Sequence, residues 1–254
     1  MGKRLLMIII GLIILPLFFT QSGFTQSSEE LKALRKEVEA LKEGQKAIQK
    51  ELQEIRNILR GKHLAQEVVF NIADDPFKGD KNAKLILIEF SDYQWPFCAR
   101  HFRETVPQIE RDYIKTGKVK YVFRNFPIES IHKEAFKAAE AANCAGEQGK
   151  YWEMHARLFA HQKALGPKDL SGHAQALGLD RPEFQQCLDS GKHATEIRND
   201  IAEGQKSGLR GTPIFFLGFT DPKNSKVKVL RVIRGAQPYA SFREAIDSLL
   251  SSQK

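Results

Sequence analysis

The fold is decided by one stretch of the chain, Phe90-Ser91-Asp92-Tyr93-Gln94-Trp95-Pro96-Phe97-Cys98. The apolar run Leu85-Ile86-Leu87-Ile88-Glu89-Phe90 leads into it and is typical of a buried strand. A helix is expected to begin at Pro96, because proline is tolerated in the first turn of a helix. The stretch therefore predicts a strand, a short turn and a helix, and the turn and helix carry a single cysteine, Cys98.

The regions around this stretch predict an α/β domain over residues 64–254. Residues 74–80 contain Asp, Pro and Gly and are expected to form a turn. Strands are expected at 68–72, 84–90, 119–123, 214–217 and 227–233, and helices at 96–115, across most of 130–206, and at 241–250.

A separate helix is expected before this domain, at residues 27–62. Its apolar residues recur at alternating spacings of three and four, which is the heptad pattern of a coiled coil. Gln45 interrupts the apolar seam, which costs stability but helps to fix register. The seam positions are Leu31, Leu34, Val38, Leu41, Gln45, Ile48, Leu52, Ile55 and Leu59.

The charges beside this seam favour pairing between parallel chains. Glu37 stands five residues before Lys42, and Glu51 five before Arg56, which are the flanking positions that bridge parallel helices. We therefore expect a homo-oligomer through residues 27–62, as a dimer or a trimer. The alternative is an amphipathic helix that folds back on its own domain.

The first 24 residues read as a targeting segment. Lys3 and Arg4 precede an apolar stretch that runs from Leu5 to Phe19. This stretch is shorter than the roughly 20 residues of a spanning helix, which favours a signal peptide, although an uncleaved anchor at residues 5–20 stays open. We therefore expect an exported protein in the periplasm or another extracytoplasmic space.

Composition narrows the class of partner. The 254 residues include 42% hydrophobic residues and 17 Phe, enough for a core, and the net charge is +8. Lys and Arg are interleaved with Glu and Asp, without a basic block or a basic–aromatic stripe. We expect no nucleic-acid partner.

Several motifs resemble the DsbA-like family of thioredoxin-fold thiol–disulfide oxidoreductases. The resemblance covers roughly residues 65–254 and implies a thioredoxin fold with a helical insertion at about 128–207. The motifs are Phe90 to Gln94, Pro96-Phe97-Cys98, Arg124-Asn125-Phe126-Pro127, Ala141-Ala142-Asn143-Cys144-Ala145, Gln148-Gly149-Lys150-Tyr151-Trp152 and Gly208-Leu209-Arg210-Gly211-Thr212-Pro213.

The chain departs from this family at its nucleophile. The resemblance implies a Cys-x-x-Cys turn, and here Trp95 stands where the first cysteine belongs, followed by Pro96, Phe97 and Cys98. One thiol cannot close that disulfide. A misread or recoded codon at position 95 is an open alternative, since a Trp codon is one base from a Cys codon and from UGA.

Cys98 has two readings. It can be an inert core residue, since free cysteine packs as a small hydrophobe, or a monothiol that forms mixed disulfides near the helix terminus. His101 lies one turn further on and is expected to be an exposed surface histidine. Cys98-x-x-His101 has only half the spacing of a metal site, so we expect no metal and no cofactor.

The resemblance also implies roles for four residues outside the turn. Pro213 is implied to be cis and to face the redox turn, so that Thr212 and Pro213 bind an extended substrate chain. Cys144 and Cys187 are implied to form a structural disulfide. Export and the odd number of cysteines agree with that pairing; two free buried thiols are the alternative.

Two functions follow from these residues. The first is an exported thiol–disulfide oxidoreductase acting on exported proteins, with a monothiol activity at Cys98 and a thiol redox partner, or with dithiol activity lost. The alternative is a redox-inactive module that binds peptides in the groove at Thr212 and Pro213 and is oligomerised by the coiled coil. Reactivity of Cys98 in the folded protein separates the two.

Overall fold

The computed structural model describes residues 22–64, 68–220 and 224–252. The chain divides into two units, Met1–Gln66 and Glu67–Lys254, and each is described by itself. The expected targeting segment, residues 1–24, falls mostly on residues outside the described ranges. Within those ranges, no helix combines the length and the apolar character that crossing a membrane requires.

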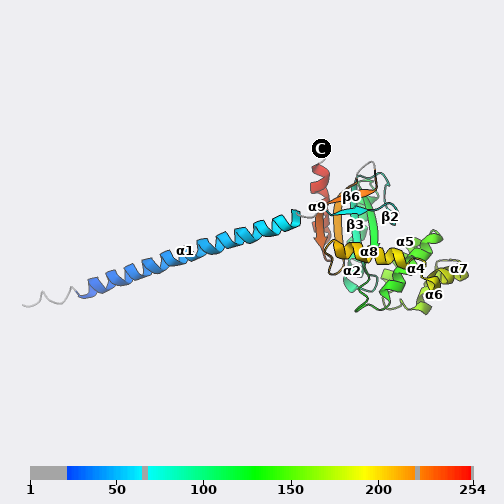
Figure 1. Cartoon of the computed structure of the whole chain (residues 1–254), viewed down its shortest axis with the longest axis horizontal. Coiled ribbons are helices and arrows are strands. Elements are labelled where there is room, and N and C mark those ends of the chain that lie inside the picture. Colours follow the sequence, from blue (N-terminus) through cyan, green and yellow to red (C-terminus); the bar gives the residue numbers. More distant parts are fainter. Residues whose placement is uncertain (1–21, 65–67, 221–223, 253–254) are drawn as a thin grey trace, which may run out of the picture. The chain divides into compact units, whose positions relative to one another are not determined.

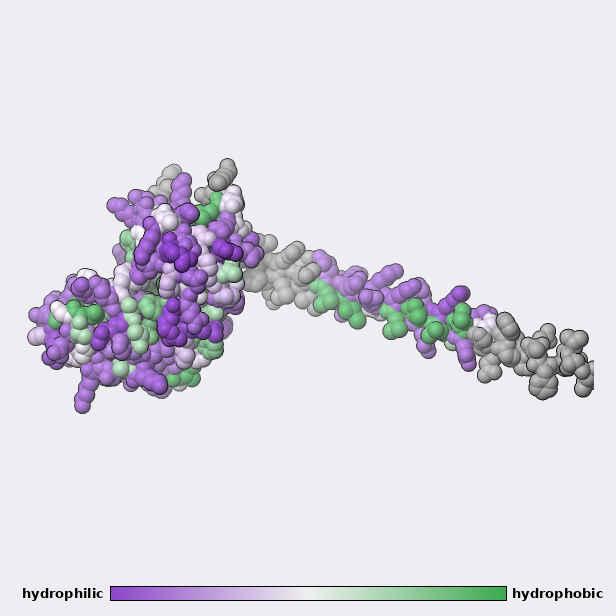
Figure 2. Space-filling model, turned by 180° about the vertical axis from the view of Figure 1, so that it is seen from behind, coloured by the Kyte–Doolittle hydropathy of each residue, from purple (hydrophilic) through white to green (hydrophobic). Residues whose placement is uncertain are grey.

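Among its described residues, the first unit contains one helix, α1 (Ser22–Leu64), which confirms the predicted N-terminal helix. The helix is continuous because its sequence is rich in Glu, Lys, Leu and Gln, all good helix formers, and has no proline. Its apolar side chains are exposed, from 41% at Val38 to 74% at Leu41. Figure 2 shows them gathered along one side of the helix. The pairing of this side with another chain stays a prediction, and the side chains of Ile55 and Leu59 are outside the described ones.

The second unit is built on a six-stranded sheet with the order β1-β6-β5-β3-β4-β2. Only β3 and β4 run parallel; the other neighbours are antiparallel. The strands are β1 (Val69–Asn71), β2 (Phe77–Lys78), β3 (Leu85–Ser91), β4 (Val119–Asn125), β5 (Ile214–Thr220) and β6 (Lys226–Arg234). This is the predicted α/β thioredoxin fold. The segment expected to be only a turn contains β2, whose two residues pair with Tyr121 and Val122 at the edge of the sheet.

Helices flank this sheet, and Figure 1 shows α4 to α7 gathered beside it. They are α2 (Pro96–Glu104), α3 (Val106–Ile109), α4 (Ala135–Glu147), α5 (Tyr151–Ala160), α6 (Pro167–Ala176), α7 (Arg181–Ser190), α8 (Ala194–Lys206) and α9 (Tyr239–Ser251).

The single helix predicted over 96–115 is wrong in detail. It breaks at Thr105 into α2 and α3 and continues as a π-helical turn, η1 (Glu110–Ile114). Pro107 explains the break, because proline has no N–H for the helical ladder and its ring clashes with the preceding turn.

The core lies on both faces of the sheet. On β3, Leu85 and Leu87 join the larger cluster, which the helical insertion completes. Ile86, Ile88 and Phe90 point to a second cluster on the opposite face. Burial on both faces makes the run 85–90 almost wholly apolar, and it fixes the end of β3, from which the redox turn starts.

Candidate functional site

The turn after β3 presents Trp95 and Cys98 at the start of α2. Trp95 is the N-cap residue, with extended backbone angles (φ −80°, ψ 122°), and Pro96 follows in the first helical turn. The backbone N–H of Cys98 donates to the carbonyl oxygen of Trp95 at 3.0 Å. The side chain at position 95 therefore stands at the helix N-terminus, and Cys98 lies in the first turn, inside the core.

Side chains rather than a disulfide fix this turn. Asp92 accepts hydrogen bonds from the backbone N–H of Gln94 and of Ile128, each at 2.8 Å. Gln162 donates to the carbonyl oxygens of Tyr93 and Trp95, at 2.7 and 3.0 Å. The conformation of the turn thus survives without the first cysteine.

Cys98 is the one free cysteine within the described residues, and it is wholly buried. Burial raises the pKa of its thiol to about 12, although the hydroxyls of Ser91 and Thr212 act in the opposite direction. A thiol in this state is protonated at neutral pH, and the thiolate is the reactive form. The surroundings therefore favour the inert reading of Cys98.

A buried acid lies close to Cys98 in the same core. Glu89 is 1% exposed, accepts a hydrogen bond from the Tyr121 hydroxyl at 2.7 Å, and has its pKa raised by burial to about 7. Sequence reasoning missed it, although a carboxylate inside an otherwise apolar strand was a visible signal. Its charge is one of the causes that raise the pKa of Cys98.

His101 is not an exposed surface histidine, and that expectation is wrong. It is 1% exposed and packs between the rings of Phe215 and Phe242, at 4.4 and 5.0 Å between centroids. The reason is its spacing: three residues after Cys98, it lies on the same, core-facing side of α2. Burial lowers the pKa of His101 to about 3, and its Nε2 lies 3.5 Å from Glu89.

The Thr212–Pro213 peptide bond is cis, as the resemblance implied. Thr212 is half-buried and its hydroxyl acts on Cys98, so the structure brings these two segments together. The carbonyl oxygen of Pro213 accepts from Gly235, whereas no described residue hydrogen-bonds the backbone of Thr212. The backbone of Thr212 is therefore available to another chain.

Aromatic rings form the rim of the turn. Trp95 packs against Phe97 and against His132, with 5.2 Å between ring centroids in both pairs. Phe97 is 47% exposed, and the Arg100 guanidinium lies over its ring at 5.0 Å. The predicted residues Trp95 and Phe97 therefore make an apolar surface at the start of α2, in the turn whose Cys98 lies near Thr212.

The implied disulfide between Cys144 and Cys187 is present and joins α4 to α7. His193 places a ring nitrogen within 4.8 Å of both sulfurs. These three residues do not fit a metal as they stand, because zinc binds thiolates and both sulfurs are bonded to each other.

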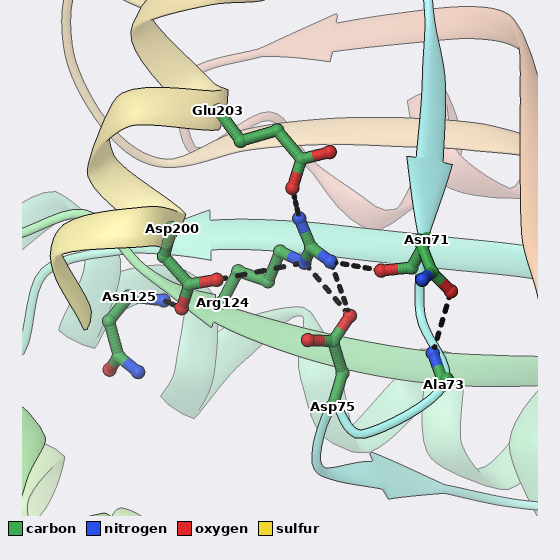
Figure 3. Close-up of polar contacts among 7 residues, drawn as sticks. All are labelled: Asn71, Ala73, Asp75, Arg124, Asn125, Asp200 and Glu203. Atoms are coloured by element: carbon green, nitrogen blue, oxygen red, sulfur yellow. Dashed lines mark hydrogen bonds and ion pairs between the residues drawn. The ribbon is translucent and has the colours of Figure 1, made fainter. Parts of the chain in front are cut away.

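A second polar cluster lies at the opposite face of the sheet, around Arg124 on β4 (Figure 3). Arg124 donates to Asp75 at 2.8 Å and to Glu203, and Asp200 lies 3.8 Å away. Burial raises the pKa of Asp75 to about 6 and that of Asp200 to about 7, although Arg124 opposes both shifts. The cluster joins the β1–β2 loop, β4 and α8, and it borders a cavity of about 240 Å³.

Comparison with known proteins shows which proteins share this sequence pattern and fold. A family model described as thioredoxin matches residues 72–248. The α-DsbA1 structure of Wolbachia pipientis superposes with a TM-score of 0.61 at 27% identity, over 71% of this chain and 92% of that one. Oxidised BdbD of Bacillus subtilis superposes with a TM-score of 0.62 at 24% identity, over 73% of this chain and 97% of that one. At that identity the similarity shows the fold alone.

Curated relatives match a smaller part of the chain. The Na(+)/H(+) antiporter NhaA 1 of Salinispora arenicola is 36% identical over 143 residues, which are 56% of this chain and 21% of the antiporter. The chain therefore spans about a fifth of that relative's length. A match of this extent concerns one segment of the antiporter.

Proposed function

This chain belongs to the thioredoxin family and has the fold of the DsbA-like thiol–disulfide oxidoreductases, and we propose that it binds extended segments of exported proteins without oxidising them. The binding surface is the rim made by Trp95 and Phe97 together with the free backbone of Thr212. Of the two functions expected from the sequence, the proposal adopts the redox-inactive peptide-binding module rather than the oxidoreductase.

The burial of Cys98 carries this proposal. Burial raises the pKa of its thiol to about 12, so the thiol is protonated at pH 7. Position 95, where the family's nucleophile would stand, holds an indole that has no redox chemistry with disulfides. The turn therefore keeps the shape of a redox site while both of its chemical groups are inactive.

The remaining surface suits an extended chain. The unpaired N–H and C=O of Thr212 can form a short β-ladder with a peptide, and the neighbouring rings offer a place for an apolar side chain. The side chains of Asp92 and Gln162 hold the turn in place, so little ordering accompanies binding.

Binding of an unfolded, apolar model peptide to the full chain tests the proposal. We expect Phe97→Ala to weaken binding at least fivefold, measured by isothermal titration calorimetry. Phe77→Ala is a matched control, because Phe77 is 39% exposed, close to the 47% of Phe97, and lies on the edge strand β2. Equal loss in both variants, or no binding by the native chain, would overturn the proposal.

A monothiol activity is the second candidate, and one observation favours it. The hydroxyls of Ser91 and Thr212 both lower the pKa of Cys98 and so favour its thiolate, although burial outweighs them. A thiol probe decides between the candidates: modification of Cys98 in the folded chain at the rate of an exposed cysteine would establish the monothiol.

We also propose that α1 joins copies of this chain in parallel, outside the cytoplasm. The exposed seam and the Glu37–Lys42 and Glu51–Arg56 spacings support self-association. The disulfide is in keeping with an oxidising compartment. Several peptide grooves on one assembly would raise avidity for an unfolded client.

A further inference from the structure

Asp92 contacts His132 in addition to the backbone N–H groups that it holds in the turn. Oδ2 of Asp92 lies 2.7 Å from Nδ1 of His132, and the carboxylate is 1% exposed. Asp92 already accepts the two backbone N–H groups that fix the turn, so the histidine is an additional partner. The carboxylate sets the orientation of the imidazole and places the proton on Nδ1.

The other ring nitrogen of His132 is left as an acceptor. None of the described residues hydrogen-bonds Nε2, and the side chain keeps 10% of its surface exposed. The ring packs against Trp95, at 5.2 Å between centroids. An imidazole with one nitrogen held by a buried carboxylate and the other free beside a binding surface is the arrangement of a general base.

We propose that His132, oriented by Asp92, binds the thiol of a cysteine-containing peptide as a thiolate–imidazolium pair beside Trp95. The proton moves from the peptide sulfur to Nε2, the Asp92 carboxylate at Nδ1 stabilises the imidazolium, and no electron is transferred. This inference rests on the proposed peptide binding and names its ligand class: extended peptides that carry a reduced cysteine.

The chemistry selects a thiol over a hydroxyl. The ordinary pKa of a thiol, about 8.5, lies about two units above that of an imidazole. The free-energy cost of this proton transfer is therefore small enough for the thiolate–imidazolium ion pair to offset most of it. A serine hydroxyl is far too weak an acid for this transfer. The rings of Trp95 and Phe97 also make favourable contacts with sulfur.

The described contacts place other charged side chains in the segments around His132. On α2, the Arg100 guanidinium lies over the ring of Phe97. In the segment before α4, Glu129 is engaged with Arg198. Asp92 is the carboxylate in contact with His132. Arg100 could also attract a thiolate, so Arg100→Gln tests that alternative: a Cys preference lost in Arg100→Gln and kept in His132→Gln would overturn the inference.

Two peptides that differ only in Cys or Ser, titrated into the full chain under a phosphine reductant at pH 7, test the inference. We expect the native chain to prefer the Cys peptide at least fivefold, with thiolate absorbance at 240 nm in the complex. His132→Gln and Asp92→Asn should bring the preference within twofold and abolish that absorbance. His161→Gln should retain both and serves as the matched control, because His161 is an exposed histidine outside the rim.

The outcomes separate this inference from the proposed function. If both peptides bind equally without thiolate absorbance, the His132 inference is wrong and peptide binding stands. If neither peptide binds, the proposed function fails. The role of His132 is then tested separately, by measuring the pKa of the thiol that Trp95→Cys introduces in a Cys98→Ala background. We expect the pKa of that thiol to lie at least one unit below 8.5, and His132→Gln to remove the shift. An unshifted thiol would overturn the inference. Far-UV circular dichroism shows whether each variant is folded.

Discussion

Nε2 of His101 lies 3.5 Å from Oε2 of Glu89, in a place where both side chains are closed to solvent. The two residues come from α2 and β3, the elements on either side of the redox turn. Burial disfavours the charged form of each: the pKa of Glu89 is raised to about 7 and that of His101 is lowered to about 3. The core near Cys98 is therefore neutral at mildly acidic pH and gains a buried charge as the pH rises.

Glu89 should make the stability of the globular unit depend on pH. Its folded pKa, about 7, lies above the ordinary value of 4.5, so its stabilising contribution is full below pH 4.5 and is lost as the pH rises through 7. The change amounts to about 3 kcal/mol. Glu89→Gln should reduce the fall in unfolding free energy between pH 5 and 8, measured by urea denaturation. A smaller slope should remain, because Asp75 and Asp200 also have raised pKa values in that range. Glu104→Gln, at an exposed position of α2, should leave the fall unchanged.

The Arg124 cluster should respond to mutation more strongly at high pH. Arg124→Met leaves Asp75 and Asp200 buried without their cation, which costs about 3–5 kcal/mol when those groups are ionised. Their raised pKa values, about 6 and 7, mean that both are largely protonated at pH 5. Thermal unfolding should therefore show a larger loss at pH 8 than at pH 5. An equal loss at both values would mean that the cluster is held by packing rather than charge.

Restoring the first cysteine should restore a redox couple. The native chain is expected not to oxidise a reduced model substrate, because Cys98 is buried and position 95 has no thiol. Trp95→Cys places a thiol at the N-terminus of α2, where the helix dipole favours its thiolate, one turn from Cys98. We expect a disulfide that cycles with a glutathione buffer, followed by mass spectrometry after alkylation. If no disulfide forms, the turn has diverged from the family in geometry as well as in sequence.

The fold was readable from the sequence because its signals are local. The run 85–90 marks a strand buried on both faces, and the heptads of α1 mark a long amphipathic helix. His101 was also readable in principle, since a spacing of three from Cys98 puts it on the same side of α2. The break at Thr105 was signalled by Pro107 and was overlooked.

The polar part of the site could not be read in this way. Asp92 and His132 are 40 residues apart, and only the packing of the segment before α4 against the turn brings them together. The same is true of Arg124 and Glu203, which are 79 residues apart. No periodicity relates such positions, so a pattern in one sequence cannot pair them.

Removing the disulfide should cost stability without changing peptide binding. Cys144 and Cys187 are separated by 43 residues, for which the chain-entropy model gives about 4 kcal/mol. Replacing both by Ala should lower the unfolding free energy by about 2–4 kcal/mol, measured in urea. The affinity for the model peptide should stay within twofold, because the bond joins α4 to α7 and neither helix contributes to the rim. A large loss of affinity with retained structure would tie the insertion to binding.

Charged residues in the seam of α1 should dissociate the expected oligomer into single chains. Leu41 and Ile48 are 74% and 61% exposed, and both occupy the seam that the heptads predict to be buried between chains. Leu41→Asp with Ile48→Asp puts two like charges per chain into that seam, so sedimentation of the full chain should fall to one copy. Ala40→Asp with Ala47→Asp adds the same charge just outside the seam and should leave the oligomer intact. A monomeric native chain would refute self-association outright. If instead both variants remain oligomeric, the contact lies outside α1, and the exposed seam has a partner other than a second copy of this chain.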